Sequence, residues 1–271
     1  MKHTVKELED LTREVRRNIM RTIASLGKGH VGGSLVLAEA MAVLYYEEMN
    51  VDPKNPKMEG RDRVVVSKGH AGPVLYSILA MQGFFDKELL LTLNKPGTIL
   101  PSHCDRILTP GVDMTTGSLG QGLSAAVGMA LSDRIAKNGA RVYCFIGDGE
   151  SQEGQIWEAG MYAAQMKVDS LTCFLDLNGH QIDGPVDTIN SMIDAGAKWR
   201  AFGWNVLEID GHDIEAVYDA IELAKRVKGK PTMIILHTIK GKGWKKVENT
   251  TKCHSMPVTP EDLEDALKDL A

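Results

Sequence analysis

This chain of 271 residues lacks the sequence features of disulfide-rich, membrane and secreted proteins. Only four cysteines are present, and their scattered positions indicate reduced cytosolic thiols and not a disulfide framework. No segment approaches the roughly 20 consecutive apolar residues that a membrane span needs. The charged, helix-forming amino terminus also has no basic stub followed by an apolar run, the pattern of a secretion signal. We therefore expect a cytoplasmic protein that does not enter membranes.

A basic surface is also missing from the sequence. Thirty-one Lys and Arg residues stand against 36 Asp and Glu residues, and no basic cluster is interleaved with aromatic residues. Nucleic acid is therefore not an expected partner. The chain does have 43% hydrophobic residues, over a length sufficient to bury one core. These values predict a single α/β domain over residues 1–271.

The clearest functional pattern lies in the middle of the chain. The apolar run Arg141–Ile146 predicts a buried strand, which breaks at Gly147–Gly149 before a helical pattern. Leu171–Leu177 predicts a second buried strand, and Asn178 follows it directly. Thirty residues separate Asp148 from Asn178 (178 − 148), the length of one βαβ unit. A right-handed crossover would bring both side chains to the same edge of a parallel sheet, where α/β folds bind ligands.

The pairing of Asp148 with Asn178 predicts a site for a magnesium-bound diphosphate. Mg²⁺ prefers oxygen ligands in octahedral geometry and usually takes one or two carboxylates together with neutral oxygens and phosphates. Gly147 and Gly149 have no Cβ, so a phosphate can approach the backbone, and the following helix offers free N–H groups. The alternative is that the three residues form only a turn. The strand that ends at Asn178 favours the metal site.

The segments GDGESQEG and NGHQIDG resemble the thiamine diphosphate signature of the transketolase family. The resemblance implies that Asp148, Asn178 and the main-chain carbonyl of His180 hold Mg²⁺, or Ca²⁺ or Mn²⁺ in its place. It also implies that Gly149 and Ile182 contact thiamine diphosphate. The imidazole ring of His180 is not implied as a ligand.

Three segments that precede this region resemble the family's histidine motifs. They are GHVGGSL, SKGHA and PSHCDR, and they occur in the family's order. The resemblance implies that His30 contacts the sugar substrate and that His70 lies beside the cofactor diphosphate. His103 stands where the family carries a further active-site histidine.

Two other segments extend the resemblance along the chain. TTGSLGQG is similar to the segment whose backbone cradles the cofactor rings, which implies that Gly117, Ser118 and Leu119 bind thiamine diphosphate. KGKGW precedes a polar loop that contains His254. In the family, the histidine of this loop reaches both the diphosphate and the substrate, so His254 is expected to contact both.

Apolar periodicity predicts the remaining elements. One helical stripe runs from Leu8 to Leu26 and stops at Gly27, and a second apolar helix is expected from Leu35 to Met49. The letters GKGHVG match GxGxxG, yet they follow a helix and not a strand, which excludes a dinucleotide site. Further helices are predicted at 74–82, 84–93, 123–136, 189–202 and 213–227, and further strands at 62–66, 206–209 and 233–237.

The resemblance covers about residues 30–254 and implies the thiamine-diphosphate-binding fold, a three-layer parallel sheet with helices on both faces. It further implies the amino-terminal subunit of a two-chain transketolase, which transfers a two-carbon ketol unit from a ketose phosphate to an aldose phosphate with thiamine diphosphate and Mg²⁺. The expected partners are sugar phosphates and a carboxyl-terminal subunit with the pyrimidine-binding domain, in an α2β2 hetero-oligomer. The expected catalytic residues are His30, His103, His254 and Glu153.

Two other functions remain open. Half of a 1-deoxyxylulose-5-phosphate synthase-like enzyme would share Asp148 and Asn178 but would not need the three histidine motifs together. A non-catalytic thiamine-diphosphate-binding module is the other possibility, because no segment supplies the glutamate that activates the cofactor. A zinc site at His103-Cys104 and Cys253-His254 is disfavoured, because the sequence has neither CxxC nor HxxxH spacing there.

Overall fold

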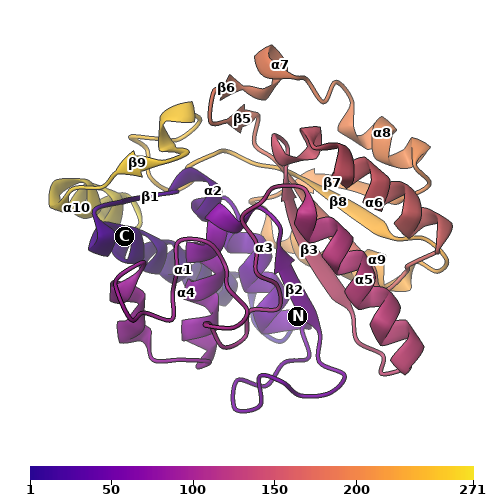
Figure 1. Ribbon diagram of the computed structural model, residues 1–271. Coiled ribbons are helices and arrows are strands. Elements are labelled where there is room, and N and C mark those ends of the chain that lie inside the picture. Colours follow the sequence, from indigo (N-terminus) through magenta and orange to yellow (C-terminus); the bar gives the residue numbers. More distant parts are fainter.

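The computed structural model describes residues 1–271 and is built on one parallel sheet of five strands (Figure 1). Its strands are β2 (Arg63–Val66), β3 (Val142–Gly147), β4 (Leu171–Leu177), β7 (Asn205–Asp210) and β8 (Thr232–His237). Their spatial order is β2-β3-β4-β8-β7, and each neighbouring pair is parallel. The predicted strands and the predicted parallel sheet are therefore confirmed.

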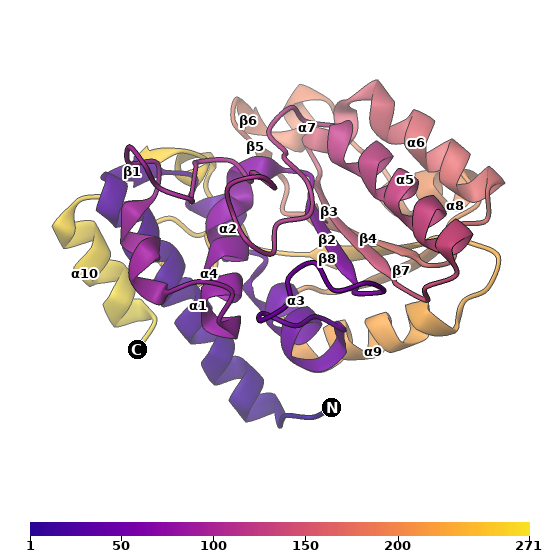
Figure 2. The ribbon, with the colours of Figure 1, turned by 60° about the horizontal axis from the view of Figure 1, so that its bottom comes forward.

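Helices cover both faces of the sheet (Figure 2). One face carries α5 (Gln121–Ala136), α6 (Gly154–Gln165) and α8 (Ala195–Ala201). The other carries α1 (Val5–Leu26), α3 (Ala38–Val43), α4 (Gly72–Gln82) and α9 (Ile214–Arg226), and α10 (Pro260–Asp269) packs on α1. Along β3, Tyr143 and Phe145 enter the core under this second set of helices, whereas Val142, Cys144 and Ile146 enter the core under the first set. This alternation explains why the strand reads as a continuous apolar run.

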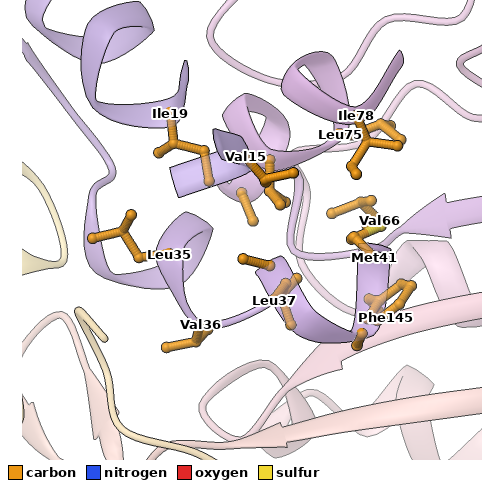
Figure 3. Packing of buried hydrophobic residues seen from close by; sticks show 14 of the residues in the cluster. Val15, Ile19, Leu35, Val36, Leu37, Met41, Val66, Leu75, Ile78 and Phe145 are labelled. Atoms are coloured by element: carbon orange, nitrogen blue, oxygen red, sulfur yellow. The ribbon is translucent and has the colours of Figure 1, made fainter. Parts of the chain in front are cut away.

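The larger of the two cores lies beneath α1, α3 and α4 (Figure 3). Val15 and Ile19 of α1 and Met41 of α3 are fully buried there, and Met41 lies next to Phe145 of the sheet. The helix α1 begins at a capping box and ends at Gly27, whose φ of 81° is the left-handed conformation that glycine adopts readily. The predicted helical stripe and its end at Gly27 are thus confirmed, and the helix begins three residues before the predicted stripe.

Short elements bring distant segments together at the carboxyl ends of the strands. β1 (Lys28–Gly29) pairs antiparallel with β9 (Met256–Pro257), so the segments that carry His30 and His254 run side by side. β5 (His180–Gln181) pairs with β6 (Gly184–Pro185). The remaining short elements are α2 (Gly32–Leu35), a π-helix (Leu44–Glu48) and 3₁₀-helices at Gly69–Ala71, Lys87–Thr92, Glu150–Gln152 and Thr251–Cys253.

The predicted helix over residues 189–202 is wrong in its first half. The short helix α7 (Val186–Ile189) ends where the prediction begins, and α8 starts only at Ala195. Asp194 has an extended backbone and accepts a hydrogen bond from the amide of Ala197 at 2.7 Å, so it acts as an N-cap. A capping aspartate starts a new helix because its side chain satisfies a free N–H group. The expected helix Leu35–Met49 is likewise divided, between α2, α3 and the π-helix. No helix is both long and apolar enough to cross a membrane.

Candidate active site

A cavity of about 430 Å³ opens at the carboxyl ends of β3 and β4. It contains the predicted site residues His30, His70, His103, Gly117, Leu119, Asp148, Gly149, Glu153, Asn178, His180, Ile182 and His254. Ser118 is the exception, because it lies in the turn between Gly117 and Leu119 and does not line the cavity. The expectation was that the backbone of this segment binds the cofactor, and for Ser118 it stays a prediction. The other motifs, which are far apart in sequence, meet in one place.

Asp148 occupies the end of β3, where it links two loops. The side chain is only 2% exposed, and its Oδ1 accepts a hydrogen bond from the amide of Gly149 at 2.7 Å. Oδ2 accepts from the amide of Gly179 at 2.6 Å, which joins the end of β3 to the end of β4. Burial, together with the nearby charge of Asp176, raises the pKa of Asp148 to about 6. A cation in this position would therefore be held by a carboxylate that has little water around it.

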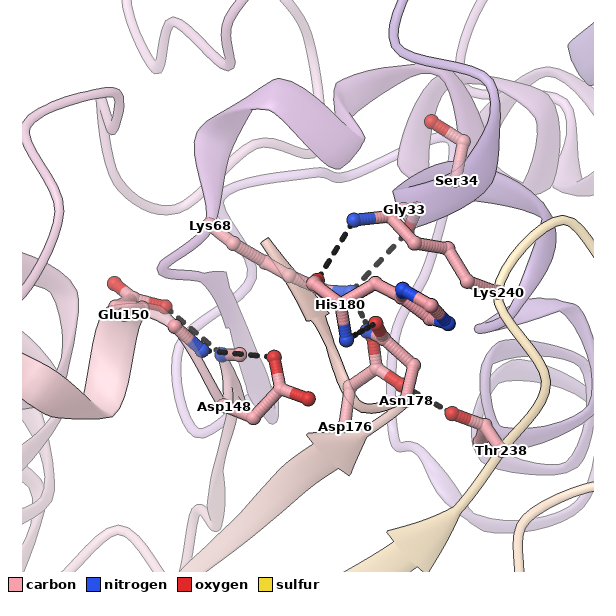
Figure 4. Close-up of polar contacts among 12 residues, drawn as sticks. Gly33, Ser34, Lys68, Asp148, Glu150, Asp176, Asn178, His180, Thr238 and Lys240 are labelled. Carbon is pink, nitrogen blue, oxygen red and sulfur yellow. Dashed lines mark hydrogen bonds and ion pairs between the residues drawn. The ribbon is translucent and has the colours of Figure 1, made fainter. Parts of the chain in front are cut away.

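Asn178 and His180 present two neutral oxygens beside Asp148 (Figure 4). The Asn178 amide nitrogen donates to Asp176 at 2.6 Å, and its oxygen accepts from the amide of His180 at 3.0 Å. The carbonyl of His180 accepts from the Lys240 ammonium at 2.7 Å. The ring of His180 lies instead 3.1 Å from the side-chain oxygen of Asn249. This arrangement agrees with a role for the carbonyl, and not the imidazole, toward a ligand.

The donor atoms and the free space fit a cation and a diphosphate. One carboxylate, one amide oxygen and one carbonyl oxygen form the mixed oxygen set that Mg²⁺ takes in proteins. At Gly149, an added Cβ would come within 2.9 Å of the Cβ of Gln181, so only glycine fits without movement. The geometry thus fits the residues that sequence reasoning selected for thiamine diphosphate and its metal.

Four buried charged residues of the site were missed by the sequence reasoning. Lys68, Glu150, Asp176 and Lys240 are each at most 2% exposed. Glu150 accepts hydrogen bonds from the amides of Gly120 at 3.0 Å and Gly147 at 3.1 Å, so it fastens the glycine-rich loop to the end of β3. A charged residue inside an apolar strand, or within three residues of its end, was the available signal, because a buried charge requires a partner.

Four histidine rings form the other side of the cavity. The ring of His30 lies 5.2 Å from that of His70 and 5.6 Å from those of His103 and His254, and the His70 and His254 rings are 5.0 Å apart. Burial lowers the pKa of all four, and for His70 it does so strongly. His103, the histidine of the PSHCDR segment, therefore lies with the other three. At neutral pH the rings are uncharged donors and acceptors.

The protonation of the His254 ring follows from its contact with Lys240. The Lys240 ammonium lies 3.1 Å from Nδ1 of His254, and because an ammonium can only donate, Nδ1 must accept. The proton of the neutral ring is then on Nε2. Burial, reinforced by the charge of Lys240, lowers the pKa of His254 to about 4. His254 consequently offers an N–H donor at Nε2 over the whole neutral range.

Two predicted residues lie at the exposed rim of the cavity. Glu153 is exposed and caps the start of α6 without a side-chain hydrogen bond. Ile182 is 63% exposed in the β5–β6 hairpin. Neither side chain is held by the chain itself, so the structure leaves both available to a ligand or to another subunit.

Comparisons with known proteins agree with this geometry. The family model described as "Transketolase, thiamine diphosphate binding domain" matches residues 9–270. The chain belongs to the transketolase family. The crystal structure of the transketolase from Campylobacter jejuni superposes with a TM-score of 0.93 at 34% identity, over 99% of this chain and 43% of that one. The thiamine-diphosphate-binding fold is confirmed.

The relatives fall into two groups of different length. This transketolase-family chain is 51% identical to "6-deoxy-6-sulfo-D-fructose transketolase subunit SqwG" of a Clostridium strain, over 97% of this chain and 96% of that protein. It is 37% identical to an apulose-4-phosphate transketolase subunit of Phocaeicola vulgatus, over 98% and 95%. Human transketolase is 36% identical, but the match spans only 42% of its length. The chain is therefore transketolase-like and corresponds in extent to the proteins named subunits.

Proposed function

We propose that this chain is the diphosphate-binding subunit of a two-chain transketolase. It would transfer a two-carbon ketol unit from a ketose to an aldose with thiamine diphosphate and a divalent cation, for which Mg²⁺ is the first candidate and Ca²⁺ or Mn²⁺ the others. The observation that carries the proposal is the single cavity that holds both the oxygen donors around Asp148 and the four histidine rings. Residues 1–271 would form one domain, since one continuous sheet underlies the cavity.

Each side of the cavity has its own task in this proposal. Asp148, the Asn178 amide oxygen and the His180 carbonyl would hold the cation, and the Lys240 ammonium would be drawn toward the diphosphate. Bound thiamine diphosphate supplies a ring that acts as an electron sink for the reacting carbon. The chain's own residues would position the sugar and move protons, with Nε2–H of His254 directed at a substrate oxygen.

The side of the cavity formed by the four histidine rings suits the hydroxyl groups that different sugar donors have in common. Neutral imidazoles donate to and accept from hydroxyl groups, and burial keeps the pKa values of His30, His103 and His254 below their usual value. The names of the two subunit relatives specify a sulfonated and a phosphorylated ketose. We therefore propose a ketose donor with a terminal anionic group. A sugar phosphate is the general expectation, and the 51% identity favours a 6-sulfo sugar as the second candidate.

A partner subunit would complete the active site. The length match to the two relatives named subunits supports a carboxyl-terminal chain with the pyrimidine-binding domain, in an α2β2 assembly. Large apolar side chains are exposed on the helices α5 and α6 and just before α8, among them Ile135, Met161, Tyr162 and Ile193. Exposed apolar side chains that lie together often form protein interfaces, so we propose these helices as the docking surface. Glu153, at the rim of the cavity, would then take part in an acidic network at the subunit boundary. The four free, buried cysteines support a cytoplasmic location.

The deciding experiment compares the chain alone with the chain plus a partner. Ketol transfer to an aldose phosphate is measured from a ketose phosphate and from a 6-sulfo ketose, with thiamine diphosphate and Mg²⁺. We expect no turnover by the chain alone and turnover after a carboxyl-terminal transketolase subunit is added. The Asp148→Ala chain mixed with the same partner is the matched inactive control.

Two outcomes would contradict the proposal. Robust turnover by the chain alone, freed of host transketolase, would refute the two-chain assignment. Cofactor binding without ketol transfer by any assembly would favour a binding or regulatory module, or half of a 1-deoxyxylulose-5-phosphate synthase-like enzyme. The latter would reveal itself by the different carbon skeleton of its product.

A further inference from the structure

Asp176 is a carboxylate at the centre of the sheet, where the fold would otherwise place an apolar side chain. It lies on β4 between Gly147 of β3 and Leu236 of β8, and it is fully buried. A carboxylate in such surroundings is costly unless donors surround it. Asp176 therefore has a local role that outweighs this cost.

Three donors from three elements meet at this carboxylate (Figure 4). Oδ2 accepts from the Lys68 ammonium at 2.5 Å and from the Asn178 amide nitrogen at 2.6 Å, and Oδ1 accepts from the Thr238 hydroxyl at 2.5 Å. Lys68 is itself buried and donates also to the carbonyl of Gly33 at 3.2 Å. The Lys68–Asp176 pair thus balances its charge internally and leaves Asp176 as an ionised acceptor.

An ionised carboxylate accepts hydrogen bonds and cannot donate one. Asn178 must consequently turn its NH₂ group toward Asp176, and its oxygen toward the opposite side. There the oxygen accepts one hydrogen bond, from the amide of His180 at 3.0 Å, and keeps a second lone pair. A 180° flip of the amide would place its oxygen against the carboxylate oxygen of Asp176 and its NH₂ group against the N–H group of His180. Both contacts would then be repulsive, so only one of the two amide orientations is allowed.

We propose that Asp176 is a positioning residue that selects the orientation of Asn178 in which the amide oxygen, and not the NH₂ group, faces the cation. Lys68 supplies the charge that keeps this acceptor in the sheet. The inference rests on the proposed function, because it assumes that Asn178 is a ligand. It assigns to the Lys68–Asp176 pair a role in metal affinity that is separate from stability.

The test measures metal binding and needs no turnover. The Mn²⁺ complex of thiamine diphosphate is titrated calorimetrically into the purified chain and its variants. Asp176→Leu removes the acceptor but leaves Lys68 without its charge partner, so it is paired with the double variant Lys68→Met/Asp176→Leu. Thr238→Val is the matched control, since it removes a hydrogen bond to the same carboxylate without touching Asn178.

We expect both Asp176→Leu chains to bind the complex about 10- to 100-fold more weakly, the usual effect of losing a group that orients a metal ligand. Thr238→Val should bind nearly as tightly as the wild-type chain. Urea unfolding separates the effect on stability from the effect on metal affinity, because the double variant should regain stability relative to Asp176→Leu without regaining affinity. Wild-type affinity in a folded double variant would overturn the inference.

The exchanged pair Asp176→Asn/Asn178→Asp provides a rescue. A carboxylate at position 178 presents an oxygen both toward position 176 and toward the cation, so neither orientation has to be selected. The amide introduced at position 176 can donate a hydrogen bond to it. We expect this variant to bind the metal complex more tightly than Asp176→Leu does, and no recovery would count against the inference. Failure of the wild-type chain to bind the complex would instead contradict the proposed metal site itself, and the inference with it.

Discussion

Removing the imidazole of His254 should slow ketol transfer strongly while cofactor binding changes little. The Nδ1 atom of the ring contacts Lys240 at 3.1 Å, so Nε2–H remains free of that contact, and the rings of His30 and His70 lie 5.6 Å and 5.0 Å away. A positioned acid or base typically contributes about 10²- to 10⁴-fold to turnover, or about 3–5 kcal/mol of barrier. We expect a loss of this size for His254→Ala in the assembled enzyme.

The pH dependence follows from the pKa of about 4 that burial and the charge of Lys240 give His254. At pH 6 about 1% of such rings are protonated, whereas an ordinary histidine would be roughly three-quarters protonated. His254 should therefore impose no acid limb on turnover above about pH 5. Because the folded pKa lies below the unfolded one, its contribution to stability is complete above about pH 6.5 and is lost as the pH falls toward about 4.

Two measurements check this reasoning. Histidine-labelled NMR of the chain, with the resonance assigned by loss in His254→Asn, should show no titration of this ring between about pH 5.5 and 8. The matched control is His237→Asn, because His237 is exposed on β8 and does not line the cavity. That variant should keep wild-type turnover. A midpoint near the ordinary histidine value, or wild-type turnover by His254→Ala, would refute the assignment.

Three further predictions concern the metal site, the loop packing and the core. Asp148→Ala should weaken binding of thiamine diphosphate with Mg²⁺ by more than about 100-fold in calorimetric titration. Loss of a residue that only supports a metal ligand already lowers metal affinity about 10- to 100-fold. Unchanged affinity would contradict the role of Asp148. Gly69→Ala should destabilise the chain by about 1–3 kcal/mol in urea unfolding, because its Cβ would lie 2.7 Å from the backbone of Thr116. Glu39→Ala should lower the free energy of unfolding by about 3–5 kcal/mol, because it leaves the buried Arg16 guanidinium without its ion-pair partner. The guanidinium donates to both carboxylate oxygens of Glu39 at 2.7 Å. A loss of less than about 1 kcal/mol would refute this.

The meeting of Asp148 and Asn178 could be predicted from local patterns alone. Two apolar runs define neighbouring strands, and their separation of 30 residues allows one right-handed crossover between them. The structure confirms the consequence through the hydrogen bond from Gly179 to Asp148. The histidines were selected differently, by resemblance to a family. The chain itself contains no local signal that His30 and His254 lie together.

Tertiary structure alone decided which charged residues support the site. Lys68 and Asp176 are 108 positions apart, and a lysine after a strand or an aspartate within one has no locally determined partner. The same holds for Lys240, whose contacts with His180 and His254 depend on how the loop after β8 folds over the sheet. Periodicity and turn chemistry act over a few residues, so they determine elements and their ends. Charge pairing in a dry interior depends on distances that only the packed chain sets.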